Sequence, residues 1–325
     1  MSKTAVILIN LGTPEAPTAK DVRRYLREFL SDRRVIGLHP IVWRPILELG
    51  ILPMRPRASA AKYQTVWMDQ GSPLTVYTDA QAQALREAIG PDIEVAVAMR
   101  YGNPAIADVV HSLVGDGCDR ILFVPLYPQY AGSSTGTVLE RIHEVVAALP
   151  QHPEVRTIHS WPDDAGYVEA ICSALEQRWE ETGRPDAAAG DKLLLSYHGI
   201  PVSHVEGGDP YPEQCARTTA AICERLGLDG DLVVATYQSK FGPAPWLSPA
   251  TIETVAELGS QGCERLEVVC PGFVSDCLET LEEIVQLNAE AYEEAGGTGF
   301  AYVPWGNDRP QWTDALAGIV SSHLW

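Results

Sequence analysis

Short apolar runs alternate along the chain with longer segments in which apolar residues recur at helical spacing. Such alternation is typical of parallel strands connected by crossover helices. The eight runs expected to form strands fall four in each half, at residues 5–10, 94–99, 120–126, 155–159, 192–197, 232–237, 265–270 and 300–303. The pattern therefore predicts an α/β protein with parallel sheets.

The two halves of the chain also resemble each other locally. Residues 117–120 (Gly-Cys-Asp-Arg) precede one predicted strand, and residues 262–265 (Gly-Cys-Glu-Arg) precede another, at an offset of 145 residues. A second correspondence pairs residues 10–14 with residues 197–201, each at the end of an apolar strand. Two similar units are therefore expected.

These correspondences set the expected domain boundaries. One unit is expected over residues 1–160 and a second over 161–305, followed by a C-terminal helix within 306–325 that packs back. The joint is expected near residues 160–190, where Gly, Pro and Ala residues form a stretch that resembles a linker.

Composition and charge exclude several classes of protein. With 325 residues, 46% of them hydrophobic, the chain can bury a sizeable core, and its formal charge of −19 argues against a general nucleic-acid binder. The N-terminus leaves no room for a signal peptide, and the seven cysteines include no Cys-x-x-Cys pair. A cytoplasmic protein with reduced thiols is expected.

Basic and apolar residues gather in one segment of this acidic chain. Residues 20–62 carry ten basic and four acidic side chains. Within them, residues 41–54 are largely apolar, but Arg, Glu and Pro interrupt them too often for a bilayer-spanning helix. An apolar segment with a cationic rim suits a membrane surface or a flat apolar ligand bearing carboxylates. A buried core helix is an equal alternative.

Candidate chemistry is sought in the loops after the strands, because ligands of open α/β sheets bind beyond the carboxyl ends of the strands. His198 ends an apolar run and precedes Gly199, so a sharp turn can leave the imidazole facing a cleft. A neutral imidazole can accept a proton or bind a transition metal, although most loop histidines are simply hydrogen-bonded. Trp246 lies in a Pro-rich loop, which implies a flat apolar ligand or another domain against it.

Two acidic residues, Glu279 and Glu283, are expected on one face of a helix that begins at Asp276. The apolar stripe of this helix is expected at Leu278, Leu281 and Val285. Like charges four residues apart are mildly unfavourable unless a cation or a proton relieves them. Asp276 and Glu279 also match a capping box, which requires no ligand, so both interpretations are open.

Six ordered motifs resemble the ferrochelatase family. They are residues 9–14 (Ile-Asn-Leu-Gly-Thr-Pro), 98–101 (Ala-Met-Arg-Tyr), 125–130 (Pro-Leu-Tyr-Pro-Gln-Tyr), 196–201 (Ser-Tyr-His-Gly-Ile-Pro), 237–243 with Trp246, and 270–281. The resemblance implies two similar Rossmann-like α/β/α lobes, each with a four-stranded parallel sheet, in the chelatase-like fold. It implies a lyase that inserts Fe²⁺ into protoporphyrin IX to make protohaem, the last step of haem biosynthesis. Coproporphyrin III as substrate, a related chelatase for another metal and tetrapyrrole, and a non-catalytic porphyrin- or haem-binding protein are the alternatives.

The resemblance also implies roles for residues. His198 would accept a proton or hold the metal, Glu279 would be its acidic partner, and Glu283 would continue an acidic path outward. The positions that match porphyrin-binding residues are Leu11, Arg55, Ser72, Arg100, Tyr101, Tyr127 and Trp246. Ser72 with Arg55 or Arg57 would meet the propionates. Residues 38–62 correspond to a lip over the pocket, through which peripheral membrane contact is expected.

Three positions depart from the family pattern. Cys277 stands where many relatives have His, and Leu287 stands where some place a third carboxylate. No cysteine follows Cys277, so the C-terminal ligands of iron–sulfur-containing relatives are missing. We therefore expect no iron–sulfur cluster and no tightly bound cofactor, with Fe²⁺ as a substrate only.

Overall fold

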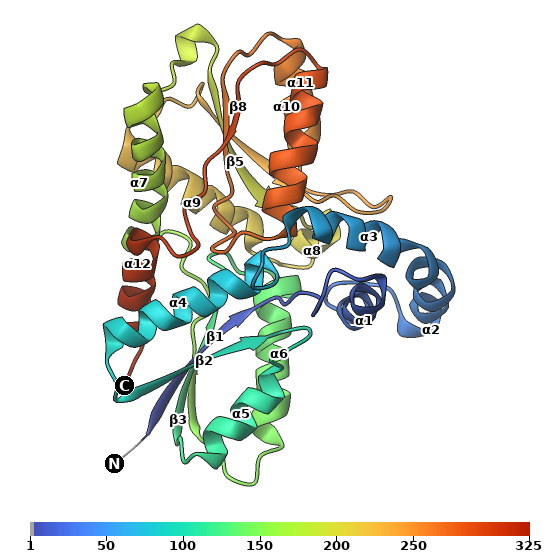
Figure 1. The fold of residues 1–325 in the computed structure, drawn as a ribbon, viewed down its shortest axis with the longest axis vertical. Helices are drawn as coiled ribbons and strands as arrows, with labels where there is room; N and C mark the ends of the chain where they lie inside the picture. The colour runs from blue at the N-terminus through green and yellow to red at the C-terminus, as the bar shows by residue number, and fades with distance from the viewer. Residues whose placement is uncertain (1–2) are drawn as a thin grey trace. The chain divides into compact units, whose positions relative to one another are not determined.

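The computed structural model describes residues 3–325, whose contacts divide into two compact units (Figure 1). Unit 1 contains the residues up to 160 together with 317–325, and unit 2 contains Trp161–Leu316. The units divide between Ser160 and Trp161, at the beginning of the interval 160–190, and the stretch at 183–190 lies inside unit 2, between α7 (Ala165–Thr182) and β5 (Lys192–His198), so it is not the linker. The reason is that α7 carries eight buried residues and therefore belongs to the core of unit 2.

Unit 1 contains a parallel sheet in the strand order β2-β1-β3-β4. Its strands are β1 (Thr4–Asn10), β2 (Ile93–Met99), β3 (Arg120–Pro125) and β4 (Glu154–Thr157). The central strand β1 is fully buried from Ala5 to Ile9, which explains its uninterrupted apolar sequence. The helices outside the 38–62 segment are α1 (Ala19–Phe29), α4 (Pro73–Ile89), α5 (Ile106–Gly115) and α6 (Thr137–Ala147), and a π-helix, η2 (Gly132–Gly136), precedes α6.

Unit 2 repeats this arrangement, with the strand order β6-β5-β7-β8. Besides β5, its strands are β6 (Val233–Gln238), β7 (Leu266–Val269) and β8 (Phe300–Tyr302). Besides α7, the helices are α8 (Val202–Glu206), α9 (Tyr211–Leu226), α10 (Thr251–Ser260), α11 (Ala289–Glu294) and α12 (Pro310–Ser321), together with the short η3 (Ala187–Ala189) and the π-helix η4 (Glu279–Asn288). All eight predicted strands are present, and the predicted α/β fold with two four-stranded parallel sheets is confirmed.

The repeated Gly-Cys sequence has a structural explanation. Gly117 and Gly262 both adopt positive φ, at 87° and 81°, a conformation that favours glycine. The following residues, Cys118 and Cys263, are both buried within the cores of their units. Each pair therefore forms the turn that leads the chain from a helix into a strand.

The basic, apolar segment of unit 1 folds into α2 (Pro40–Pro45), the π-helix η1 (Ile46–Ile51) and α3 (Leu52–Val66). Its inner face forms a small core of its own, in which Trp43, Leu47 and Leu52 pack with Leu30. Its outer face is exposed, and the side chains of Ile41 and Leu49 are 79% and 81% accessible to solvent. The two alternatives, a core helix and an exposed apolar surface, thus each describe one face of the segment. Among residues 3–325, none of the helices combines the length and apolarity that a membrane crossing requires.

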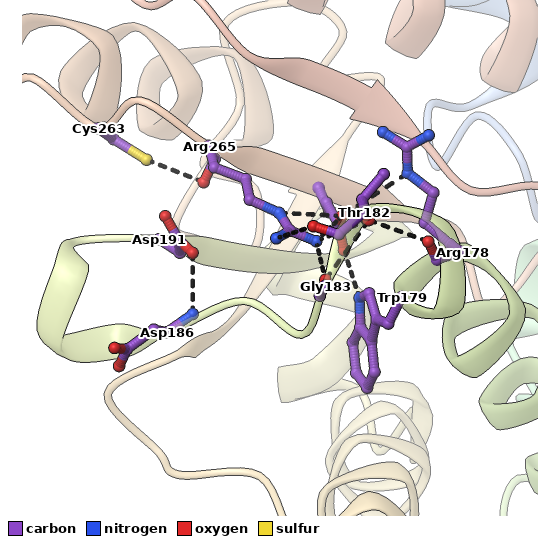
Figure 2. A network of polar contacts seen from close by, with 9 residues as sticks. Arg178, Trp179, Thr182, Gly183, Asp186, Asp191, Cys263 and Arg265 are labelled. Carbon is purple, nitrogen blue, oxygen red and sulfur yellow. Dashed lines mark hydrogen bonds and ion pairs between the residues drawn. The ribbon is translucent and has the colours of Figure 1, made fainter.

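The buried carboxylate of Glu267 joins α7 to the beginning of β7. Glu267 is 1% exposed, and it accepts hydrogen bonds from Trp179 Nε1 at 2.7 Å and from Arg265 Nη2 at 2.7 Å. The Arg178 guanidinium lies 3.7 Å away. Arg265 also donates to the hydroxyl of Thr182 and the carbonyl of Gly183, as Figure 2 shows. Because a buried charge is costly unless it is paired, this network fixes the amino-terminal end of the second sheet.

Candidate active site

His198 is the last residue of β5, the central strand of the sheet in unit 2. The strands β6 and β7 lie on opposite sides of β5, so the strand order reverses there, as it does where α/β proteins bind ligands. A Cβ on the next residue, Gly199, would lie 2.9 Å from the Gln238 carbonyl oxygen and 3.2 Å from the Trp246 ring. Only glycine fits this turn, which holds the imidazole at the strand end.

The environment of His198 favours a neutral ring. The side chain is partly buried, and its ring meets Phe273 edge-on at a centroid distance of 6.3 Å. Burial lowers the pKa of His198 because it removes water from the protonated ring, and the charge of Glu279 opposes this effect. A neutral imidazole next to a carboxylate can accept a proton or bind a metal ion.

Glu279 begins η4, which is a π-helix and not the predicted α-helix. A π-helix has i→i+5 hydrogen bonds, and these change which residues share a face. The residues of η4 that are buried are Thr280, Glu282, Ile284 and Asn288. Val285 is 40% exposed, so the predicted apolar stripe is wrong.

The predicted capping box is also absent. The buried carboxylate of Asp276 accepts hydrogen bonds from the hydroxyls of Thr280 and Tyr302 at 2.7 and 2.6 Å, and from Asn307 Nδ2 at 2.7 Å. The η4 helix has no side-chain cap at its first turn. The side chain of Glu279 is partly exposed and is not used as a cap, and its carboxylate interacts with the thiol of Cys277.

Glu283 is anchored by the loop after β6. Its two carboxylate oxygens accept from the N–H and the hydroxyl of Ser239, at 2.6 and 2.5 Å. Burial raises the pKa of Glu283, and the two Ser239 hydrogen bonds oppose the rise. Glu283 thus holds a loop in place, and an acidic path through it stays a prediction.

Trp246 lies beside the turn that follows His198. The N–H of Leu247 donates to the Ile200 carbonyl at 3.0 Å, and the N–H of Val202 donates to the Pro245 carbonyl at 2.9 Å. The indole ring therefore contacts Gly199, and it is partly exposed. Its Nε1 is buried and has no hydrogen-bond partner within residues 3–325.

In unit 1, the loops after β1 and β2 are bound to each other. The N–H of Tyr101 donates to the Leu11 carbonyl at 2.9 Å, and a Cβ on Gly12 would lie 1.8 Å from the Tyr101 carbonyl oxygen. Arg100 Nη2 and the Tyr101 hydroxyl both donate to the carboxylate of Asp32, at 2.5 and 2.9 Å. Asp32 is not among the predicted site residues, although it is one of only four acidic residues in the basic segment.

Three further predicted residues belong to unit 1. The Tyr127 hydroxyl is buried and has no hydrogen-bond partner in the described part of the chain, and burial raises the pKa of this phenol. Ser72 is 4% exposed, and its hydroxyl accepts from Thr13 at 2.9 Å. Arg55 is exposed on α3. The predicted residues of this unit therefore differ in accessibility: Tyr101 and Ser72 are buried, at 1% and 4% exposed, whereas Arg55 is exposed.

The arrangement provides two donors for a metal ion. His198 and Glu279 interact electrostatically in unit 2, whereas Leu11, Arg100 and Tyr101 are grouped in unit 1. In residues 3–325, there is no group of three or more His, Cys, Asp and Glu side chains that could hold a metal ion. The neutral imidazole at the end of β5 can accept a proton, and metal binding by His198 together with Glu279 stays a prediction.

Comparisons with known proteins agree in pointing to metal chelatases. The family model described as ferrochelatase matches residues 3–324. Ferrochelatases of Neisseria gonorrhoeae and Neisseria meningitidis are 46% and 45% identical over 323 residues, which is 99% of this chain and 94% of each relative. Among solved structures, SirB from Bacillus subtilis with Fe³⁺ aligns with a TM-score of 0.59 at 14% identity, over 99% of this chain and 95% of that one. The sirohydrochlorin chelatase SirB in complex with cobalt gives a TM-score of 0.56 at 13% identity, with the same shares of the two chains covered. The last two similarities concern the fold alone.

Proposed function

The chain belongs to the ferrochelatase family, and from this premise we propose that it inserts Fe²⁺ into protoporphyrin IX with His198 and Glu279 as the catalytic pair. As a ferrochelatase it is a metal-chelating lyase. The observation that carries the assignment of the pair is the partly buried imidazole at the end of β5, whose lowered pKa is opposed by the charge of Glu279.

The reaction requires the chain to handle protons as well as a metal. When Fe²⁺ enters a porphyrin, two pyrrole N–H bonds break, four Fe–N bonds form and two protons leave. His198, neutral at pH 7, is proposed to accept a pyrrole proton or to hold the incoming ion, and Glu279 is proposed to bind the ion or to receive the proton. Glu283, one turn further along η4, is proposed as the next acidic group toward solvent.

Residues of unit 1 are proposed to bind the macrocycle. Leu11 and Tyr127 offer apolar surface. The Tyr101 ring is 1% exposed, with the Arg100 guanidinium over it at 4.4 Å, so it would reach the macrocycle only after these neighbours move. The exposed Arg55 is suited to a propionate, because guanidinium and carboxylate form strong paired hydrogen bonds. Trp246 of unit 2 is proposed to pack against the macrocycle.

Two buried groups constrain this proposal. Because Ser72 is buried and bonded to Thr13, it would reach a propionate only after giving up that bond. The Arg100 charge is already balanced by Asp32, so Arg100 would orient a ligand by hydrogen bonding more than by net charge. We therefore expect Arg55→Ala to weaken porphyrin binding more than Ser72→Ala does.

Anaerobic absorbance of the purified protein with protoporphyrin IX and Fe²⁺ tests the catalytic assignment. Wild type should convert the free-porphyrin spectrum to that of haem, and His198→Ala should bind porphyrin but fail to insert the metal. Glu279→Gln should lower turnover severely while retaining the fold. Insertion by His198→Ala at the wild-type rate would refute the assignment, and faster conversion of coproporphyrin III would refute the choice of porphyrin.

The exposed face of the lip is proposed to touch a membrane surface. Ile41, Leu49 and Met54 are 79%, 81% and 73% exposed, and several arginines lie in the same segment. Apolar side chains with a cationic rim bind interfaces that contain anionic lipids. The proposed location is therefore cytoplasmic, with peripheral contact at the inner face of the membrane.

Sedimentation with lipid vesicles tests this contact. Wild type should bind vesicles that contain phosphatidylserine more strongly than vesicles of phosphatidylcholine alone, and Ile41→Ser with Leu49→Ser should reduce binding. Val285→Ser with Leu287→Ser provides the matched control, because these residues are also exposed, at 40% and 38%, but lie on η4. Equal loss of binding in both double variants would contradict a specific role of the lip.

A further inference from the structure

Gln238, which no comparison assigns a role, connects the two elements that carry His198 and Glu279. We propose that Gln238 is a positioning residue for iron insertion: it fixes the beginning of η4, and therefore the Glu279 carboxylate, relative to the imidazole at the end of β5. This inference rests on the proposed function of the His198–Glu279 pair.

The Gln238 amide bridges β5 and η4 directly. Gln238 is 2% exposed and is the last residue of β6. Its Oε1 accepts from the Ser196 hydroxyl at 2.8 Å, and its Nε2 donates to the main-chain carbonyl of Glu279 at 2.7 Å. Ser196 lies in β5 two residues before His198. One side chain thus spans the distance between the strand that ends in the imidazole and the first residue of the π-helix.

The backbone of Gln238 strengthens the connection to His198. The two residues are paired in the β5–β6 ladder, and the N–H of Gly199 donates to the Gln238 carbonyl at 2.8 Å. Any displacement of Gln238 would therefore also displace the turn that orients the imidazole. The positions of both reacting side chains depend on this one residue.

The first turn of η4 is held by hydrogen bonds from outside the helix. The residue before it provides no side-chain cap. Gln238 donates to the main-chain carbonyl of Glu279, and the next residue in the chain, Ser239, binds both carboxylate oxygens of Glu283. These two consecutive residues thus hold η4 at two points, the backbone of Glu279 and the side chain of Glu283.

The polar network behind Gln238 keeps its amide in one orientation. The Ser196 hydroxyl is also 2.9 Å from Thr251 Oγ1, which in turn donates to Thr236 Oγ1 at 2.9 Å. A buried network whose members are hydrogen-bonded to each other is rigid, and it resists rotation of a side chain. The Nε2 donor is therefore directed at the Glu279 carbonyl, and a side chain without this donor could not replace it.

Steady-state kinetics of Gln238→Leu and Gln238→Met test the inference. Both variants lose the donor to Glu279, and Met is unbranched and similar in length to Gln, so Gln238→Met keeps the shape of the site if Gln238→Leu fails to fold. Displacement of a reacting group by about 1 Å can cost about 100-fold in rate, so we expect kcat per folded molecule to fall by about 10- to 100-fold. The dissociation constant for protoporphyrin IX, from fluorescence quenching, should change less than about twofold, because Gln238 does not face the ligand surface.

A double-mutant cycle separates positioning from structural support. In a Glu279→Gln background, Gln238→Leu should lower kcat by at most a further factor of about two, because the effects of two residues that act through the same group are not additive. Insertion of Zn²⁺, followed by the fluorescence of the zinc porphyrin, makes low rates measurable, and imidazole and carboxylate donors accept Zn²⁺ as well. Gln261→Leu is the control for the loss of an amide, because Gln261 is the exposed C-cap residue of α10 and its amide donates to the Glu257 carboxylate.

The outcomes distinguish the inference from the proposed function. If both Gln238 variants keep wild-type kcat, or if their effect is the same in the Glu279→Gln background, Gln238 does not act through Glu279. If Glu279→Gln itself keeps wild-type turnover, the proposed function of the pair fails and the positioning role fails with it. A fall in kcat with an unchanged porphyrin affinity, lost in the Glu279→Gln background, supports the inference.

Discussion

Removal of the Arg265 side chain should destabilise the protein far more than removal of an arginine from an equally well-formed surface ion pair. In the Arg265→Ala variant, Glu267 would lose two guanidinium hydrogen bonds at 2.7 and 3.2 Å while staying almost completely buried. Breaking a buried pair typically costs 3–5 kcal/mol, because it leaves an uncompensated charge.

The structure indicates the lower end of that range. Trp179 would still donate to Glu267 at 2.7 Å, and the Arg178 guanidinium would still lie 3.7 Å away, so the carboxylate would keep part of its stabilisation. Arg265 also contacts the end of α7 through Thr182 and Gly183, and those bonds would be lost. We therefore expect a loss of about 3 kcal/mol in the free energy of unfolding of unit 2.

The matched control is Arg217→Ala. Arg217 forms a two-pronged pair with Asp163 in the same unit, at 2.7 and 3.2 Å, but the side chains are 48% and 45% exposed. An exposed pair typically contributes less than about 1 kcal/mol. Urea denaturation of both variants, followed by circular dichroism, gives the two free energies.

Arg265 pairs with a buried carboxylate and also bonds α7, whereas Arg217 pairs with an exposed carboxylate, so equal losses would refute the reasoning. The Arg265 network lies at the amino-terminal end of β7, whereas His198 lies at the carboxyl-terminal end of β5. Iron insertion per folded molecule should therefore stay at the wild-type level in Arg265→Ala, and a loss of kcat in the folded variant would contradict this separation.

The remaining predictions concern a turn, the thiols and pH. Gly12→Ala should lower the free energy of unfolding by at least about 2 kcal/mol and lose much of the activity, because its Cβ would clash with the Tyr101 carbonyl. In the same denaturation assay Gly208→Ala should lose less, because Gly208 has a similar φ but open space around it. Native protein at pH 8 should react with one equivalent of Ellman's reagent, at the half-buried Cys223, and more slowly than a free thiol because burial raises the pKa of Cys223; reaction of two or more cysteines at a similar rate would contradict the burial of the other six. Burial lowers the pKa of His198 below its ordinary 6.5, so on acidification the unfolded chain binds this proton before the folded chain does. The free energy of unfolding of wild type should therefore fall relative to that of His198→Gln as the pH drops below 6.5. A rise of this difference at low pH would contradict the lowered pKa.

Local patterns in the sequence predicted the strands and the turn glycines well. A buried parallel strand such as β1 has to be apolar throughout, and the turn after His198 leaves no room for a Cβ. Both requirements act within a few residues, so the sequence displays them. The repeat also predicted two similar units with four strands each, and the structure shows the equivalent strand order in both sheets.

Features that depend on distant residues could not be predicted in this way. The start of η4 is held by Asn307, 31 residues beyond Asp276, and by Gln238, 41 residues before Glu279. A capping box and an apolar stripe predict a helix correctly only if the helix is an α-helix whose start is not held by tertiary hydrogen bonds. The helix that forms is a π-helix that begins at Glu279, whereas the sequence pattern predicted a start at Asp276. The hydrogen bonds that hold its start come from distant residues, so no local pattern predicts them.

The lip differs from the rest of the chain in its origin as well as in its position. Five helices (α1, α2, η1, α3 and α4) separate β1 from β2, whereas two (α8 and α9) separate the equivalent strands β5 and β6. Compared with the repeated scaffold, the lip is thus an insertion, and it brings its own small core of Leu30, Trp43, Leu47 and Leu52. Such a self-packed insertion can diverge in sequence and length while the sheet beneath it stays unchanged. Evolution could therefore adapt the binding surface of one half of an ancestral duplication without altering the chemistry retained in the other.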